Sequence, residues 1–220
     1  MAEIGLFEAM ATCRTVRRLK PDPVPDDLLR QVLTAATWAP SGGNRQPWRF
    51  VVVRDAELKR QLRDLYLPVW ERFSGAYRAA TANLQGTART RGEHMVAAAD
   101  HLARHLDAVP VIVVVCVHMA DLAITDAGLD RPPVVGGASV YTAVQNLLLA
   151  CRGVGLGGAL TTLLCRHEPE VKKLLGIPDG WATCAHIPIG FPAGTGHGPL
   201  HRQPVEKIAF LDGWERPLFR

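Results

Sequence analysis

The most chemically suggestive part of the sequence is a cluster of basic residues near its start. The segment CRTVRRLKPDPVP carries Arg14, Arg17, Arg18 and Lys20, followed by Pro21, Pro23 and Pro25. Proline fixes its own φ and favours extended backbone in the residue before it, so this segment is stiff. Guanidinium groups held by a stiff segment can surround a phosphate. A solvated basic turn explains the composition equally well.

A second polar group lies in the turn APSGGNRQPW, between a predicted helix and a predicted strand. Ser41, Asn44 and Gln46 supply hydrogen-bond donors and acceptors there. A glycine-rich turn before a buried strand can also present backbone amides to a ligand. The alternative is an ordinary connection, although the turn is long and polar for that purpose alone.

A third candidate is the glycine-rich stretch in which Gly153, Gly155 and Gly158 match the pattern GxGxxG. The dinucleotide-binding fingerprint requires a strand before the glycines and a helix after them. Here a predicted helix comes first and a predicted strand, 159–162, follows, so we reject a dinucleotide-binding fold. Thr161 and Thr162 end that strand and can meet the polar edge of a ligand.

The histidines and cysteines do not predict a metal site. His101 and His105 are one helical turn apart, a spacing that suits two zinc ligands, but the glutamate of HExxH and a third ligand are missing. We expect a solvated helix face there, and a core histidine at His186. No CxxC occurs among the five cysteines, Cys13, Cys116, Cys151, Cys165 and Cys184, so neither a zinc site nor a disulfide framework is expected.

The longest uncharged stretch predicts the central element of the fold. No charge occurs between Arg131 and Arg152, and residues 134–151 predict a helix of about five turns, apolar on every side and therefore buried all round. A membrane span is the alternative, but polar residues within it argue against one: Ser139, Tyr141, Thr142, Gln145 and Asn146. A chain of this length can hardly surround such a helix alone, which predicts a homodimer with the helix at its seam.

Hydrophobic periodicity predicts the remaining elements. The expected helices span 4–12, 26–39, 56–70, 93–106 and 166–175, the second capped by Asp26 or Asp27. The expected strands span 49–53, 111–117, 159–162, 181–190 and 208–211, and the second should be buried on both faces. Between 71 and 92 the pattern breaks down, which indicates either a mobile lid over a pocket or a plain surface excursion.

The totals set the class of protein. With 220 residues, 48% of them hydrophobic, we expect one globular domain over residues 1–220, with a possible lid at 71–92. The net charge of +4 is mild and no basic run alternates with aromatic residues, so nucleic acid is not an expected partner, whereas the arginines suit a small anion. The N-terminal MAEIGLFEAM is not typical of a signal peptide, which makes the cytoplasm the default location.

Four segments together resemble the nitroreductase family of FMN-dependent oxidoreductases. CRTVRRLKPDPVP is similar to the N-terminal arginine element of that family, and APSGGNRQPWRFVVV to its APSxxNxQPW element. GLGGALTT resembles the turn and strand beside the flavin, and HRQPVEKIAFLDGW the C-terminal element. Each motif is weak alone, but all four occur in order between residues 14 and 214. The resemblance implies an α+β fold with a mixed sheet flanked by helices, in an intertwined homodimer that binds FMN at each end of its interface.

The resemblance also implies roles for individual residues. The FMN phosphate and ribityl chain would be held by Arg14, Thr15, Arg17 and Arg202. The isoalloxazine ring would meet Pro40, Ser41 and Asn44 of the partner subunit, and Gly158, Leu160, Thr161 and Thr162. One position departs from the pattern, because Cys13 stands where the family usually has a first arginine and removes one potential phosphate cation.

The implied reaction is hydride transfer from NAD(P)H through FMN to a small oxidised acceptor, a nitro compound or a quinone, by a ping-pong mechanism. The flavin carries this chemistry, so no catalytic side chain is expected. Three alternatives stay open on the same scaffold: reductive dehalogenation, oxidative fragmentation of the flavin, and storage or sensing of flavin without turnover. The donor also stays open, between NADH, NADPH and a deazaflavin.

Overall fold

Strand β2, Val111–His118, is the centre of the fold. In the computed structural model, which describes residues 4–194 and 196–219, this strand is buried along all but its last residue, as the run VIVVVCV predicts. All strand pairings within the described ranges are antiparallel. The sheet has the order β1-β2-β4-β3, in which β1 is Trp48–Val53, β4 is Trp181–Gly190 and β3 is Gly157–Gly158.

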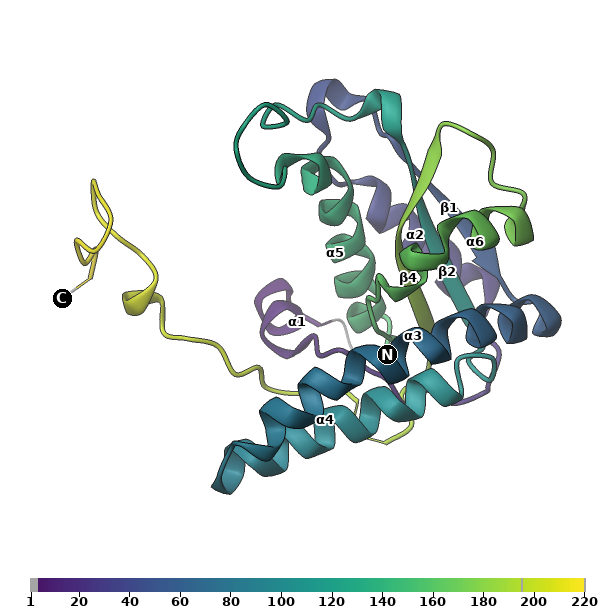
Figure 1. Cartoon of the computed structure of the whole chain (residues 1–220), viewed down its shortest axis with the longest axis horizontal. Helices are drawn as coiled ribbons and strands as arrows, with labels where there is room; N and C mark the ends of the chain where they lie inside the picture. The colour runs from purple at the N-terminus through teal and green to yellow at the C-terminus, as the bar shows by residue number, and fades with distance from the viewer. Residues whose placement is uncertain (1–3, 195, 220) are drawn as a thin grey trace.

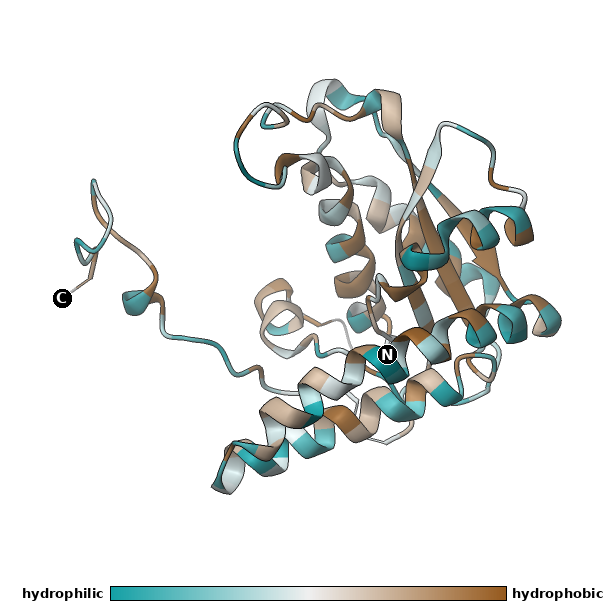
Figure 2. Cartoon of the chain, viewed as in Figure 1, coloured by the Kyte–Doolittle hydropathy of each residue, from teal (hydrophilic) through white to brown (hydrophobic). Residues whose placement is uncertain are grey.

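Helices cover both faces of the sheet (Figure 1). Alternate residues of β2 point to opposite sides: Val113 and Val115 pack with α2 and α5, whereas Ile112 and Val114 pack with α3, α4 and α6. These helices are α2 (Asp26–Thr37), α3 (Ala56–Ala82), α4 (Gly86–Arg104), α5 (Ala138–Gly153) and α6 (Glu168–Leu175). Figure 2 shows the apolar residues concentrated on the sheet and the helix sides that face it. The expected α+β architecture is confirmed, with antiparallel pairing in place of the expected mixed sheet.

The smaller elements join these layers. A short helix, α1 (Leu6–Thr12), precedes the basic segment and packs beside α5. Single 3-10 turns span Gly42–Asn44, Met119–Asp121, Val135–Gly137, Leu163–His167 and Val205–Lys207. The predicted cap of α2 is wrong, because Pro25 occupies the N-cap position and Asp26 and Asp27 lie in the first turn. Their carboxylates there still favour the positive end of the helix dipole.

Helix α5 is buried on one side only within a single chain. Its buried residues, Val140, Ala143, Val144, Leu147 and Cys151, face the sheet and α2, whereas Tyr141 is 43% exposed. The prediction of burial all round is therefore wrong for an isolated chain, because the sheet covers only one side of the helix. No helix in the described ranges combines the length and the apolar character needed to cross a membrane.

The segment 71–92 is helical, which corrects the expectation that regular structure breaks down there. Helix α3 continues to Ala82 and α4 begins at Gly86, so the two lie side by side as a hairpin (Figure 1). Small residues permit this close packing: a Cβ atom on Gly92 would lie 2.7 Å from Cγ2 of Thr81. Because small residues form the contact, the hydrophobic period that normally reveals a helix is weak here.

The strand predicted at 159–162 begins earlier and is shorter. Strand β3 is Gly157–Gly158, and beyond it only Thr161 pairs with β4, through a single bridge to His186. The cause is Pro188 of β4, which accepts a hydrogen bond from the Ala159 N–H but has no N–H of its own to return. The ladder is therefore interrupted between Gly158 and Thr161.

The C-terminal residues form an arm that leaves the body of the molecule (Figure 1). The strand predicted at 208–211 is not formed, and Phe210 makes only an isolated bridge with Pro217 of the same arm. An extended segment that leaves the sheet has no neighbouring strand to pair with, so its backbone pairs locally.

A buried histidine predicts how stability depends on pH. His186 is 1% exposed, and within the described structure neither of its ring nitrogens has a hydrogen-bond partner. Burial lowers the pKa of His186 to about 4, whereas an unfolded chain has a histidine pKa of about 6.5. Between these values the unfolded state binds a proton that the native state does not. The free energy of unfolding should therefore fall by up to about 3 kcal/mol as the pH drops from about 6.5 to about 4.

Urea unfolding at a series of pH values measures this loss. The variant His186→Gln should show a shallower fall, while His94→Gln, at an exposed position of α4, should keep the wild-type slope. An unchanged slope in His186→Gln would contradict the assignment.

Candidate functional site

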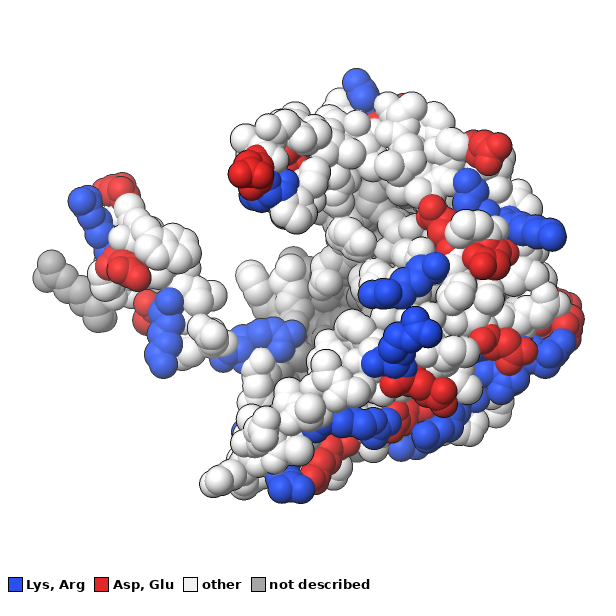
Figure 3. Space-filling model, in the orientation of Figure 1, with Lys and Arg blue, Asp and Glu red and all other residues white. Residues whose placement is uncertain are grey.

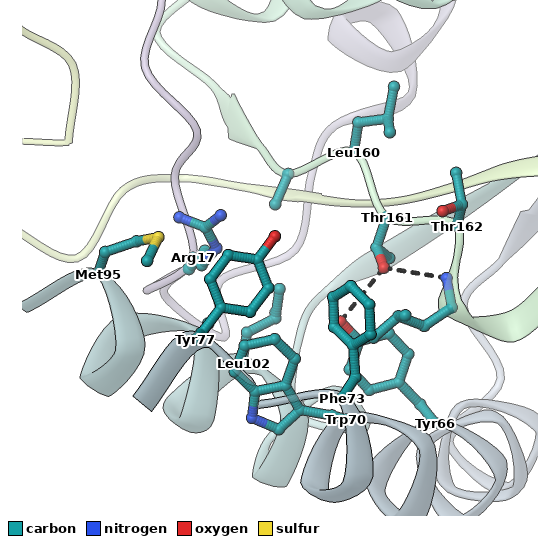
Figure 4. A pocket seen from close by; sticks show the side chains of 13 residues that line it. Arg17, Tyr66, Trp70, Phe73, Tyr77, Met95, Leu102, Leu160, Thr161 and Thr162 are labelled. Carbon is teal, nitrogen blue, oxygen red and sulfur yellow. Dashed lines mark hydrogen bonds between the residues drawn. The ribbon is translucent and has the colours of Figure 1, made fainter. Parts of the chain in front are cut away.

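A cavity of about 270 Å³ lies between the α3–α4 hairpin and the segment that follows β3 (Figure 4). One wall is aromatic and comes from α3: Tyr66, Trp70, Phe73 and Tyr77. Apolar residues of α4 adjoin it: Met95, Ala99 and Leu102. The opposite wall is the run 159–163, and Arg17 is the one charged residue of the lining within the described chain. The cavity therefore combines flat apolar surfaces with a single cation.

Arg17 is half-buried, and its guanidinium forms no hydrogen bond or ion pair with another residue in the described ranges. Burial lowers the pKa of Arg17 below its ordinary value, and the nearby phenols of Tyr66 and Tyr77 oppose that shift. An arginine nonetheless stays protonated in proteins. Its N–H donors are therefore available to a ligand with an acceptor atom or a negative charge.

The backbone fixes Thr161 at the other side of the cavity. Its N–H donates to the His186 carbonyl over 3.1 Å, and the His186 N–H donates to the Thr161 carbonyl over 2.9 Å. The Thr161 hydroxyl accepts a bond from the Leu163 N–H over 3.4 Å and donates to the Tyr66 hydroxyl over 3.2 Å, as the dashed lines of Figure 4 show. A hydroxyl pair thus links α3 to the run after β3.

A partly buried carboxylate stiffens the aromatic wall. Asp100 of α4 accepts the indole N–H of Trp70 over 2.8 Å and two bonds from Arg78 over 2.7 and 2.8 Å. Burial raises the pKa of Asp100, but these hydrogen bonds outweigh it and hold the pKa below its ordinary value. The rings of Phe73 and Tyr77 pack edge to face, with centroids 5.4 Å apart. The wall is therefore tied to both helices of the hairpin.

Close backbone packing brings the basic segment to the cavity. The Val16 N–H donates to the Gly158 carbonyl over 2.9 Å. A Cβ atom on Gly157 would lie 2.7 Å from the Cβ atom of Val16, so only glycine allows the two segments to run this close. Arg17, the next residue, consequently reaches the lining beside Leu160 and Thr161.

The structure thus brings together part of the predicted set. Arg17, Leu160, Thr161 and Thr162 all line the cavity, and Gly158 adjoins it through Val16. Arg14 is exposed and donates twice to the Pro199 carbonyl, over 2.8 and 3.1 Å; Thr15 is exposed beside it.

Other predicted residues lie elsewhere in the single chain. Pro40, Ser41 and Asn44 lie in the turn between α2 and β1. This turn packs beside the start of α5, where the Gly42 N–H donates to the Ser139 hydroxyl over 3.0 Å. Arg202 is exposed on the C-terminal arm and donates to the neighbouring His201 carbonyl. Cys13 faces α5, with its Sγ atom 3.5 Å from the Leu148 carbonyl oxygen. None of these belongs to the cavity lining.

The aromatic wall is what sequence reasoning missed. Tyr66, Trp70, Phe73 and Tyr77 follow the spacing i, i+4, i+7 and i+11, which places them on one face of a helix. This signal is present in the sequence, but ending the predicted helix at Trp70 divided it between a helix and a segment predicted to be a lid or a surface excursion.

The outer surface of the hairpin carries charges of both signs (Figure 3). Arginines there pair with nearby carboxylates, for example Arg89 with Glu93 over 2.8 Å. On the side shown, α3 and α4 therefore do not form the continuous basic face that nucleic acid requires. The rings of His101 and His105 stack with centroids 4.4 Å apart, and His105 Nδ1 lies 2.8 Å from the His101 carbonyl oxygen.

Known proteins are similar to this chain in sequence or in fold. An "NADH dehydrogenase" of Thermus thermophilus is 32% identical over 89% of this chain and 90% of its own length. A 5,6-dimethylbenzimidazole synthase of Rhodobacter capsulatus is 29% identical over 96% of this chain and 95% of its length. The crystal structure of an oxidised iodotyrosine deiodinase, bound to FMN and 3-iodo-L-tyrosine, superposes with a TM-score of 0.66 and 27% identity, covering 91% of this chain and 94% of that one.

The family model agrees with these likenesses. The model of the nitroreductase family matches residues 11–191, from the basic segment to the end of β4, and so includes every element that builds the cavity. Since the match covers most of the sequence and the fold agrees, the chain belongs to the nitroreductase family.

Proposed function

We propose that this member of the nitroreductase family is an FMN-dependent oxidoreductase that passes hydride from NAD(P)H to a small oxidised acceptor, a nitro compound or a quinone. The observation that carries the proposal is the cavity itself. There the Arg17 guanidinium, which has no protein partner in the described ranges, and the Thr161–Tyr66 hydroxyl pair face an aromatic wall. Names among the relatives, such as NADH dehydrogenase, support an enzyme of this class.

The residues present suit FMN. Gly158, Leu160, Thr161 and Thr162 would lie along the isoalloxazine ring, and Arg17 would donate to its polar edge. Arg14, Thr15 and Arg202 would hold the phosphate, and the turn with Pro40, Ser41 and Asn44 would come from the partner subunit. Support comes from the half-buried Arg17 cation, which lacks a protein partner in the described chain, and from the FMN in the related deiodinase structure. When bound, FMN supplies the hydride chemistry.

The chain's own residues orient the reactants and exclude water. The aromatic wall offers stacking surface to a planar ring, and Asp100 keeps Trp70 in place. Correct orientation lowers the barrier without an acid or base, which suits a lining in which Arg17 is the charged residue. Donor and acceptor would use this one cavity in turn, which is a ping-pong mechanism, and the α3–α4 hairpin would act as the lid of a single domain.

We also propose that two copies form a homodimer. Large apolar side chains are exposed on α1, after α2 and on the C-terminal arm: Phe7 is 84%, Trp38 76% and Trp214 83% exposed. Exposed apolar surface of this kind commonly marks an interface. A dimer would also cover the open side of α5 and bring the arm, with Arg202, to a second subunit.

The cavity favours a neutral acceptor over a halogenated amino acid. A substrate with both an ammonium and a carboxylate needs a negative group as well as a positive one, and in the described ranges no Asp, Glu or Lys lines the cavity. Reductive dehalogenation, flavin fragmentation and flavin storage are alternative functions, but each is supported only by the shared scaffold.

The absorbance of the purified protein tests the proposal. We expect flavin bands at about 370 and 450 nm that bleach when NADPH or NADH is added without oxygen, because the cavity presents the flavin to the donor. The control is free FMN at the same concentration with a quinone acceptor. Bands that do not bleach, or turnover no faster than that of free FMN, would indicate storage or another reductant.

Replacing Arg202 by alanine tests the phosphate assignment. Loss of one charge-assisted hydrogen bond, about 1.5–3 kcal/mol, should weaken FMN binding about tenfold or more. Titration of the apoprotein with FMN, followed by quenching of flavin fluorescence, gives the dissociation constant. Arg216→Ala, also on the C-terminal arm, is the matched control and should bind as the wild type does. If Arg202→Ala bound FMN as tightly as Arg216→Ala does, Arg202 would not be a phosphate-binding residue.

The oligomeric state is measured by light scattering during gel filtration. With a chain mass of 24.0 kDa, we expect twice that mass at every concentration at which the protein stays folded, because an obligate dimer does not separate without unfolding. A stable monomer that retains FMN would contradict the dimer.

A further inference from the structure

The hydroxyls of Thr161 and Tyr66 form a pair at the cavity, with their oxygen atoms 3.2 Å apart. The Leu163 N–H can only donate, and it takes one acceptor position of the Thr161 Oγ1 atom at 3.4 Å. Within the pair, the Thr161 hydroxyl can donate its proton to the Tyr66 oxygen. A phenol oxygen that accepts one bond still has its own proton to give. In that arrangement the phenolic proton of Tyr66 is free for an acceptor in the cavity.

Tyr66 is held in place from both sides. Its residue is 4% exposed and belongs to the core cluster that α3 forms with β2 and α4. The Thr161 backbone is locked to His186 by two hydrogen bonds, so the partner of the phenol cannot move away. Burial raises the pKa of Tyr66 above its ordinary value, against smaller opposing effects of Thr161 and Arg17, so the phenol keeps its proton at neutral pH.

The lining offers donors but no carboxylate acceptor. Its polar side chains in the described ranges are one guanidinium and four hydroxyls: Arg17, and Tyr66, Tyr77, Thr161 and Thr162. Arg17, Thr161 and Thr162 are proposed to hold the flavin, so the hydroxyls of Tyr66 and Tyr77 are the donors that this lining leaves for an acceptor. A molecule that suits them is a flat apolar ring with hydrogen-bond acceptor oxygens and no positive charge. Quinones and nitroarenes have these properties.

We propose that the Tyr66 hydroxyl donates a hydrogen bond to a carbonyl or nitro oxygen of the acceptor, and that Thr161 is the positioning residue that aims it. The inference rests on the proposed function, because it assumes that the acceptor enters this cavity. It assigns the choice between oxygen-bearing rings and plain aromatic rings to one phenol.

Equilibrium binding tests this without turnover. Menadione is titrated into the oxidised, flavin-loaded protein with no NAD(P)H present, and 2-methylnaphthalene, the same ring system without the two oxygens, is titrated in parallel. The wild type should bind menadione more tightly than 2-methylnaphthalene. Tyr66→Phe should weaken menadione binding about 3- to 10-fold, the loss of one net hydrogen bond, and should leave 2-methylnaphthalene unchanged.

Two further variants complete the test. Thr90→Ala removes an exposed hydroxyl of α4 that donates to the Gly86 carbonyl outside the lining, and this variant should bind both compounds as the wild type does. Thr161→Val keeps the phenol but frees it to rotate, so menadione binding should fall by less than in Tyr66→Phe. Flavin content is measured for each variant before titration.

Three outcomes would overturn the inference: an unchanged menadione affinity in Tyr66→Phe, an equal loss for both compounds, or a wild type that binds no menadione. The flavin bleaching described above is independent of these titrations. If the flavin bleaches as expected but the menadione titrations give one of these three outcomes, the proposed function still stands and only the role of Tyr66 is refuted.

Discussion

The missing N–H of Pro188 decides where the sheet ends. Without it, strand β4 cannot complete its ladder with the run after Gly158, and the backbone pairs again only at Thr161. The residues between are released from the sheet and form one wall of the cavity. A functional surface next to a rigid strand is thus obtained from one interrupted hydrogen bond, with Thr161 held as firmly as a strand residue.

The second wall depends on a different constraint, the close packing of two helices. Tyr66 and Trp70 belong to the apolar core, while Phe73 and Tyr77, each 42% exposed, lie beyond it on the part of α3 that packs against α4. Asp100 joins the two helices at this boundary through Trp70 and Arg78. One end of the cavity therefore adjoins the core beneath the sheet, and the other end is formed by the hairpin.

Much of this could be predicted from the sequence. The run VIVVVCV, buried on both faces, and Gly176, which ends α6 with a positive φ of 64°, follow local rules. Arg17 and Thr161, which line the cavity, belong to motifs that are short and local and can therefore be recognised in the sequence. The aromatic wall was missed because the contact between α3 and α4 uses Gly92 and small residues, which weaken the hydrophobic period.

The remaining errors have a common cause, because they depend on neighbours that are distant in the sequence. Periodicity cannot reveal that Pro188 interrupts a strand near residue 160, or that the sheet covers only one side of α5. Such residues have recognisable types, but only the fold decides which of them meet.

The contact between Gly92 and Thr81 determines how closely α4 packs against α3. A side chain at this position would meet Thr81 at once, so either the Thr81 side chain or α4 itself would have to shift. An outward shift of α4 would carry with it Met95 and Ala99, one and two turns further along the helix, and widen the cavity that they line. Through a substitution at Gly92, natural or laboratory evolution could thus change the breadth of the cavity without altering any residue of its lining.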